Sequence, residues 1–356
     1  MRNLLGAFLL LVLCLLSVSP SAASNKTAPL AAWGCGGDND DGQCTIQLLT
    51  DQSLTAIAAG TAHTLALTKA GSVIAWGCGR DENYGQCRVP ASARHRVKAI
   101  AAGAFHSLAL TRDGRVIAWG CDGLIDAGQC RVPPAAERNV VAIAAGQVHS
   151  LALTMAGRVT AWGCRKGNDA GQCSVPPPAR RNVIAVAAGS FQSLALTSNG
   201  SVIAWGCRGD NNDGQCRVPA LAQRNVTAIA AGSTYSLALT SSGEVIAWGC
   251  NGIDFGQCSV PATAKTRITA IAAGTNHSLA LTGNGRVIAW GCGDDHGIIG
   301  SSFGQCDVPA TVTQGVTAIS AGYAHSLALK AITRDHARSQ KCDHGAIAEC
   351  AVVRLR

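Results

Sequence analysis

The chain is poor in charged and in aromatic residues. Of its 356 residues, 14% are Asp, Glu, Lys or Arg and 4% are Phe, Trp or Tyr, whereas 47% are hydrophobic. This balance excludes an intrinsically disordered chain. Glutamate and lysine, which favour helices, are scarce, whereas glycine is abundant, with 41 residues, and Ala, Val, Ile and Leu occur in short runs. The composition therefore favours many short strands joined by tight turns.

Signatures of catalysis are also missing. No Ser/His/Asp set, paired-carboxylate signature or phosphate-binding loop stands out, so we expect neither an enzyme nor a cofactor. The chain has no basic cluster with interleaved aromatic residues, which argues against nucleic acid as a partner.

The N-terminus has the order of a secretory signal. Arg2 precedes an apolar run from Leu4 to Val18, and small residues follow at Ser21-Ala22-Ala23. This order predicts a signal peptide at residues 1–23 and a secreted, extracellular protein. A membrane anchor would need a longer apolar run, so we expect no membrane span.

Tryptophan marks a repeat. Seven tryptophans, each in the string AWGC, are spaced by 43 residues and once by 42: Trp33, Trp76, Trp119, Trp162, Trp205, Trp248 and Trp290. A second string, similar to AAGxxHSLALT, recurs between them. Strict self-similarity at this period is typical of a propeller or a solenoid.

The strands expected within one repeat favour the propeller. In the second repeat, "VKAIAAG" and "HSLALT" read as short strands, the turn Arg112-Asp113-Gly114 leads into "RVIAWG", and "GQCRVP" reads as a fourth, edge strand ended by proline. Four strands in about 43 residues make one propeller blade. We therefore predict an all-β, seven-bladed β-propeller of four-stranded antiparallel blades over residues 24–330, with tryptophan between neighbouring blades.

The two ends of the repeat array complement each other. The first AWGC has no LALT strand before it, and the last LAL strand, at residues 327–329, has no AWGC after it. We predict that residues 30–47 pair with residues 317–330, so that N- and C-terminal strands share one blade and leave no open edge. Residues 331–356 form a separate C-terminal tail.

These strings resemble the repeat of the regulator of chromosome condensation family, which carries a WGxNxxGQ core and a VxxVAAGxxHSLAL segment. The resemblance extends from Ala31 to Lys330 and implies a seven-bladed propeller. Its "VIAWG…GQ…VP" blades look closest to an exported type that includes a secreted bacterial inhibitor of β-lactamase. The chain departs from the family by placing cysteines after WG and after GQ, and by the sequence "GQCTIQ" in its first repeat.

Cysteine usage supports export. Cys14 lies in the predicted signal, which leaves 16 of the 17 cysteines, an even number that favours disulfides. Zinc is disfavoured because no CxxC or histidine pattern adjoins them, so no metal is expected. Seven predicted pairs bracket the loop between the third and fourth strands of a blade, and an eighth lies in the tail. They are Cys35 with Cys44, Cys78 with Cys87, Cys121 with Cys130, Cys164 with Cys173, Cys207 with Cys216, Cys250 with Cys258, Cys292 with Cys306 and, in the tail, Cys342 with Cys350.

Aromatic residues are expected on one face. Connectivity places the GxxHS loops and the cysteine loops together, and four aromatic residues fall in GxxHS segments: Phe105, Phe191, Tyr235 and Tyr323. Rigid aromatics near the axis suit a partner-binding surface, although they could equally cap the central channel. We expect structural hydrogen bonds from the recurrent histidines, which are His63, His106, His149, His277 and His325, with Gln192 and Tyr235 at the same position in two blades. The Asp/Asn-rich loops suggest Asx turns more than a calcium site.

The opposite face carries a partial basic ring of Arg96, Arg138, Arg181, Arg224 and Arg267. This ring is either a solvated rim or an attractant for an anionic polymer. Four triplets match the N-glycan acceptor motif, at Asn25, Asn199, Asn225 and Asn276.

The leading functional hypothesis is a secreted, disulfide-stapled, monomeric module that binds an unidentified protein partner through its aromatic loop tips, including as an inhibitor. The family resemblance implies an alternative, guanine-nucleotide exchange or another regulatory scaffold role. A second alternative is binding of an extracellular polysaccharide.

Overall fold

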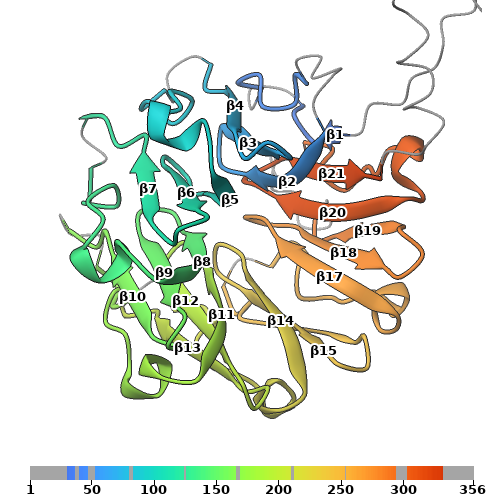
Figure 1. The fold of residues 1–356 in the computed structure, drawn as a ribbon. Helices are drawn as coiled ribbons and strands as arrows, with labels where there is room; N and C mark the ends of the chain where they lie inside the picture. Colours follow the sequence, from blue (N-terminus) through green and yellow to red (C-terminus); the bar gives the residue numbers. More distant parts are fainter. Residues whose placement is uncertain are drawn as a thin grey trace, which may run out of the picture.

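Seven three-stranded antiparallel sheets stand in a ring within the described residues (Figure 1). The computed structural model describes residues 30–36, 40–46, 53–79, 83–123, 126–165, 169–209, 212–252, 254–293 and 303–331. The predicted signal peptide, Asn25, the predicted pair of Cys342 with Cys350 and the tail after residue 331 lie outside these ranges. In each sheet the inner strand lies nearest the axis, the middle strand follows it, and the outer strand lies at the periphery.

The strands recur with the sequence repeat. Blades one to three are β2 (Leu54–Ala59), β3 (His63–Thr68) and β4 (Val73–Gly77); β5 (Val97–Ala102), β6 (Ser107–Thr111) and β7 (Val116–Trp119); and β8 (Val140–Ala145), β9 (Ser150–Thr154) and β10 (Val159–Trp162). Blades four to six are β11 (Val183–Ala188), β12 (Gln192–Thr197) and β13 (Val202–Gly206); β14 (Val226–Ala231), β15 (Ser236–Thr240) and β16 (Val245–Trp248); and β17 (Ile268–Ala273), β18 (Ser278–Thr282) and β19 (Val287–Trp290).

Blade seven joins the two ends of the propeller. It consists of β20 (Val316–Ala321), β21 (Ser326–Lys330) and β1 (Leu30–Trp33), with Leu30 opposite Leu329 and Trp33 opposite Ser326. The predicted sharing of one blade is therefore present. The predicted range was too long, because pairing ends at Trp33 and residues 40–46 belong to a cysteine loop.

The predicted fourth strand is wrong. After each outer strand the chain makes a turn and then, within the described segments, enters a short 3-10 helix at η3 (Ala91–Ala93), η5 (Pro134–Ala136), η6 (Pro177–Arg180), η8 (Ala220–Gln223), η9 (Ala262–Ala264) or η10 (Ala310–Val312). In blade two the Arg131 N–H donates to Gly128 O within that turn, so it is not available to a ladder. The prolines that follow lack an N–H, and η5 begins just after Pro133. The apolar residues and the terminal proline of the GQCRVP segment are compatible with both an edge strand and an extended link, so the sequence did not distinguish the two.

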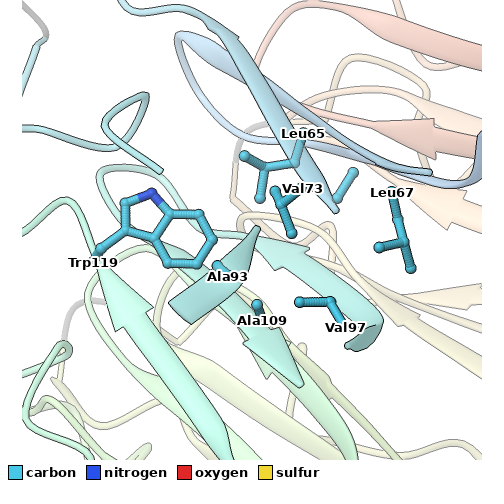
Figure 2. Close-up of a cluster of buried hydrophobic side chains, with 8 residues drawn as sticks. Leu65, Leu67, Val73, Ala93, Val97, Ala109 and Trp119 are labelled. Atoms are coloured by element: carbon cyan, nitrogen blue, oxygen red, sulfur yellow. The ribbon is translucent and has the colours of Figure 1, made fainter. Parts of the chain in front are cut away.

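The hydrophobic core lies between blades. The middle strands have the pattern Leu-Ala-Leu, and alternate side chains point to opposite faces of a sheet. Leu65 and Leu67 of β3 therefore pack against blade two, where Ala109 of β6 leaves room for the indole of Trp119 (Figure 2). Trp119 is 8% exposed, and the same arrangement recurs around the ring. The sequence-based placement of tryptophan between neighbouring blades is confirmed at this junction.

Connectivity defines two faces. The top face carries the GxxHS loops, between inner and middle strands, and the cysteine loops after the outer strands. The bottom face carries the hairpin turns, such as residues 111–115, and the links that lead to the next inner strand, such as residues 137–139. In the described part of the chain, no helix has the length and apolar character needed to cross a membrane.

Candidate partner-binding face

The top face is built on cysteine loops that are closed by disulfides. Within the described residues all seven predicted repeat pairs are bonded, each within its own loop, with Cα–Cα distances of 6.0–6.2 Å. The bonds join Cys35 to Cys44, Cys78 to Cys87, Cys121 to Cys130, Cys164 to Cys173, Cys207 to Cys216, Cys250 to Cys258 and Cys292 to Cys306. Disulfides persist in oxidising compartments, so this pattern points to an oxidising, extracellular type of environment.

Asp and Asn shape these loops by local hydrogen bonding. In blade two the Gly128 N–H donates to Asp126 Oδ1 at 2.7 Å, and the Ala127 N–H donates to Gln129 Oε1 at 2.7 Å. The first contact is an Asx turn, which recurs in blades one, three, four and five and at residues 40–42. No group of three potential metal ligands occurs among the residues that the structure describes.

Each loop also binds the next blade through the backbone carbonyl of its glutamine. Gln86 O accepts hydrogen bonds from Trp119 Nε1 at 2.8 Å and from Ser107 Oγ at 3.1 Å, and both donors belong to blade two. Gly120 follows the tryptophan with φ +89°, and a Cβ there would lie 2.5 Å from Gln86 Cα. The recurrence of WG and GQ is thus explained by contact between blades. The recurring WG and GQ strings are visible in the sequence, but an interpretation that treats each blade by itself does not predict a contact between them.

The recurrent histidines extend the same contacts, and their tautomer follows from the hydrogen-bond pattern. Ser107 has one hydroxyl proton and gives it to Gln86 O, so Ser107 Oγ must accept from His63 Nε2–H, 3.0 Å away. The same serine contact is made by His106, His149 and His277, and His325 uses Thr64 in blade one. Nε2 of each histidine therefore carries a proton.

Burial keeps these histidines neutral. Nδ1 of all five histidines is buried without a hydrogen-bond partner. Burial lowers the pKa to about 3 for His63, His149 and His277 and to about 4 for His106 and His325, from an ordinary 6.5. Neighbouring histidines lower the pKa of His63 further. These side chains join the blades and do not face solvent.

Gln192 and Tyr235 make different contacts at the histidine position. Gln192 Nε2 donates to Gly232 O and Tyr235 O, both at 3.0 Å, across the junction with blade five. The Tyr235 hydroxyl donates to His277 O in blade six, and burial raises its pKa. Tyr235 is 0% exposed, which corrects its assignment as a loop-tip aromatic. It stands one residue later in GxxHS than Phe105, and this offset turns the ring into the blade junction.

The other three aromatic residues lie around a central depression on the top face. This cavity has a volume of about 690 Å³, and Phe105, Phe191 and Tyr323 are part of its wall, with Asp41, Gln147 and Thr275 among the polar lining residues. Tyr323 is 45% exposed. Phe105 is half-buried and meets Tyr84 edge-on, with ring centroids 5.3 Å apart. The sequence placed the Asp/Asn-rich loop that contains Asp41 on this face, but it gave no indication of Gln147.

Backbone hydrogen bonds hold the loops around the depression. Ala104 N–H donates to Gly146 O at 3.2 Å, and Tyr323 N–H donates to Gly60 O at 3.1 Å across the closure of the ring. Of the glycan acceptor sites, Asn276 is half-buried on this top face. Asn199 and Asn225 are exposed on the bottom face.

The repeat, the ring of sheets and the contacts between blades define a β-propeller. The Regulator of chromosome condensation (RCC1) repeat matches residues 54–86, 97–124, 183–215, 226–257 and 268–298, which fall in blades one, two, four, five and six. The protein therefore has an RCC1-like propeller.

Solved structures show the same fold. Prp20p from Saccharomyces cerevisiae is 21% identical, with a TM-score of 0.63, and the match covers 88% of this chain and 94% of Prp20p. Human WBSCR16 is 22% identical, with a TM-score of 0.57 and coverage of 79% and 87%. The ectodomain of the Physcomitrella patens receptor kinase CR4 is 20% identical, with a TM-score of 0.53 and coverage of 76% and 68%. No curated protein matches the chain.

Proposed function

We propose that the protein is a secreted binding module, without catalytic activity, that captures another protein in the depression on its top face. The main support is the convergence of Phe105, Phe191 and Tyr323 on one cavity from blades two, four and seven. Aromatic side chains in concave, partly desolvated positions supply a large share of binding energy at protein interfaces.

The contrast between framework and loop tips also supports this role. The glutamine, tryptophan and histidine contacts repeat around the ring, whereas the pair of residues between Gly and the histidine position differs from blade to blade, for example Ala104-Phe105 before His106 and Ser190-Phe191 before Gln192. Positions that serve the blade recur, so varied positions on a rigid frame suit recognition of one partner.

The oxidised propeller suits an extracellular setting. The disulfides of the described loops disfavour the nucleotide-exchange alternative, because cytosolic thiols are kept reduced. Among proteins of the same fold, the structure of Prp20p was described with its binding to Gsp1p and histones, and yeast RCC1 was described bound to Kap60. These examples support protein binding as a use of this fold, and the proposal includes inhibition of the captured partner.

Affinity capture from the extracellular medium of the source organism tests the proposal. The wild-type protein should retain a specific partner, identified by mass spectrometry, and the triple variant Phe105→Ala, Phe191→Ala, Tyr323→Ala should lose it, with an affinity loss of at least about 100-fold. Gln314→Ala, an exposed change on the bottom face, serves as the matched control. Equal retention by the triple variant and the wild type would exclude the top depression as the binding surface.

A further inference from the structure

Exposed apolar side chains gather on one sector of the bottom face. Among the described residues, five large hydrophobic side chains are exposed, and four of them lie on this face in blades three to five: Val141 (41%), Met155 (78%), Ile184 (56%) and Leu221 (66%). Val141 and Ile184 are the second residues of the neighbouring inner strands β8 and β11, Met155 is in a hairpin turn, and Leu221 is in η8.

The repeat shows that three of these side chains, Val141, Met155 and Ile184, are not needed by the blades. The position of Met155 is filled in the other described hairpins by Lys69, Arg112, Ser198, Ser241 and Gly283. The position of Val141 and Ile184 is filled elsewhere by Thr55, Lys98, Thr227, Thr269 and Thr317. A side chain required for blade packing would recur, so apolar residues that replace polar ones only in this sector serve contact with something outside the propeller.

Arginines flank the apolar side chains. Arg138, Arg158, Arg181 and Arg224 are exposed on the turns and links of the same sector, and the two ion pairs of the described residues, Arg88–Asp122 and Arg131–Asp126, lie on the top face. In the described links and turns of the bottom face between residues 137 and 226, one side chain carries a carboxylate, that of Glu137. The sector therefore has an excess of positive charge that its own carboxylates do not neutralise.

The backbone holds these tips in fixed positions. Met155 N–H donates to Asn139 O at 2.8 Å, and Val183 N–H donates to Gly157 O at 3.2 Å, so the Met155 hairpin is tied to the links on both sides. These hydrogen bonds hold the Met155 hairpin and the neighbouring links in place, so the apolar side chains can contact a surface without a loop first becoming ordered.

We propose that this sector, formed by Val141, Met155, Ile184, Leu221 and the four arginines, docks the propeller on a membrane surface that contains anionic phospholipid. Protruding apolar side chains enter the boundary between headgroups and acyl chains, while adjacent guanidinium groups bind lipid phosphates. An acidic polysaccharide would account for the arginines but gives no role to Met155 and Leu221, which makes the lipid surface the better match.

Vesicle sedimentation tests the proposal. Full-length protein made in the bacterial periplasm forms its disulfides and carries no N-glycan on the exposed Asn199 and Asn225. It should bind vesicles of phosphatidylcholine with phosphatidylserine and should not bind vesicles of phosphatidylcholine alone. Met155→Ser with Leu221→Ser should weaken binding about tenfold or more with all charges retained. Arg181→Gln with Arg224→Gln should weaken binding roughly 30-fold.

A matched control separates this sector from general positive charge. Arg165→Gln with Arg208→Gln removes the same charge from exposed positions on the top face of blades three and four, and it should leave vesicle binding unchanged. Near-ultraviolet circular dichroism, dominated by the buried tryptophans, verifies folding of each variant. Equal vesicle binding by the wild type and the Met155/Leu221 variant would overturn the proposal. If both proteins were also retained equally on heparin, the arginines would be assigned to binding of a polyanion. Binding without phosphatidylserine would also overturn it.

Discussion

Acidification tests the assignment of the histidines to the blade junctions. The unfolded chain takes up a proton on each histidine near the ordinary pKa of 6.5, whereas burial lowers the pKa of the five junction histidines to about 3 or about 4 in the folded state. Between these limits the unfolded state holds more protons than the folded state. The contribution of these histidines to the free energy of unfolding is therefore complete above pH 6.5. It is lost progressively as the pH falls to about 4 for His106 and His325 and to about 3 for the other three.

The magnitude follows from the pKa difference. Each junction histidine changes the free energy of unfolding by about 1.4 kcal/mol per pH unit in this window. At about pH 5 the loss is roughly 2 kcal/mol for one histidine and on the order of 10 kcal/mol for five, comparable to the whole stability of an ordinary domain. The pKa of Asp113 is also lowered from its ordinary 3.8, mainly by its hydrogen bond with Thr111, so this carboxyl acts below the range of about pH 5 to pH 7 in which the histidines are tested.

Guanidinium chloride unfolding, followed by tryptophan fluorescence with the disulfides intact, measures this dependence. The slope of the free energy of unfolding against pH should correspond to an uptake of about five protons near pH 5. His106→Gln should reduce this uptake by one, since glutamine occupies the same position in blade four. A free energy of unfolding that stays constant between about pH 5 and pH 7 would refute the neutral, buried state of these side chains.

Two further predictions concern stability. Replacing Cys121 and Cys130 by serine should lower the free energy of unfolding by about 2–3 kcal/mol in the same denaturation experiment, because the disulfide closes a short loop in the unfolded chain; an unchanged midpoint would mean that the Asx turn alone fixes the loop. Arg96 has a φ of +59°, and Asn139, at the equivalent position of the next link, has a φ of +58°. Arg96→Asn should therefore raise the free energy of unfolding by about 0.5–1 kcal/mol, because asparagine tolerates left-handed backbone better than arginine, and a decrease would contradict that account.

Most of the fold could be predicted from the periodicity of the sequence. The spacing of the tryptophans indicated blades, and the unmatched strings at the two ends of the array indicated that β1 completes the sheet of β20 and β21, which the pairing of Leu30 with Leu329 demonstrates. Both inferences depend only on the positions of the repeated AWGC and LALT strings, which can be read from the sequence. The local cysteine pairs, such as Cys78 with Cys87, were predictable for the same reason, because each pair recurs with its own loop.

Contacts between blades were harder to predict, because the sequence does not say which residue reaches across a junction. The carbonyl of Gln86 accepts a hydrogen bond from Trp119 of the following repeat. The recurring WG and GQ strings mark both residues, but they do not show that the two meet. Tyr235 was misplaced for a related reason, because one residue of offset decides between a loop tip and a buried junction. The fourth strand failed because hydrogen bonding, and not apolar content, defines a ladder.

The closure of blade seven couples two distant parts of the chain in time as well as in space. β1 is synthesised before all other strands and finds its partner β21 only after six blades have followed it. A product that stops before Ser326 leaves the first strand without a partner and the ring open on both flanks. Among the described strands, the last one to be made thus decides whether the first one is buried, so that an incomplete chain exposes an unpaired strand.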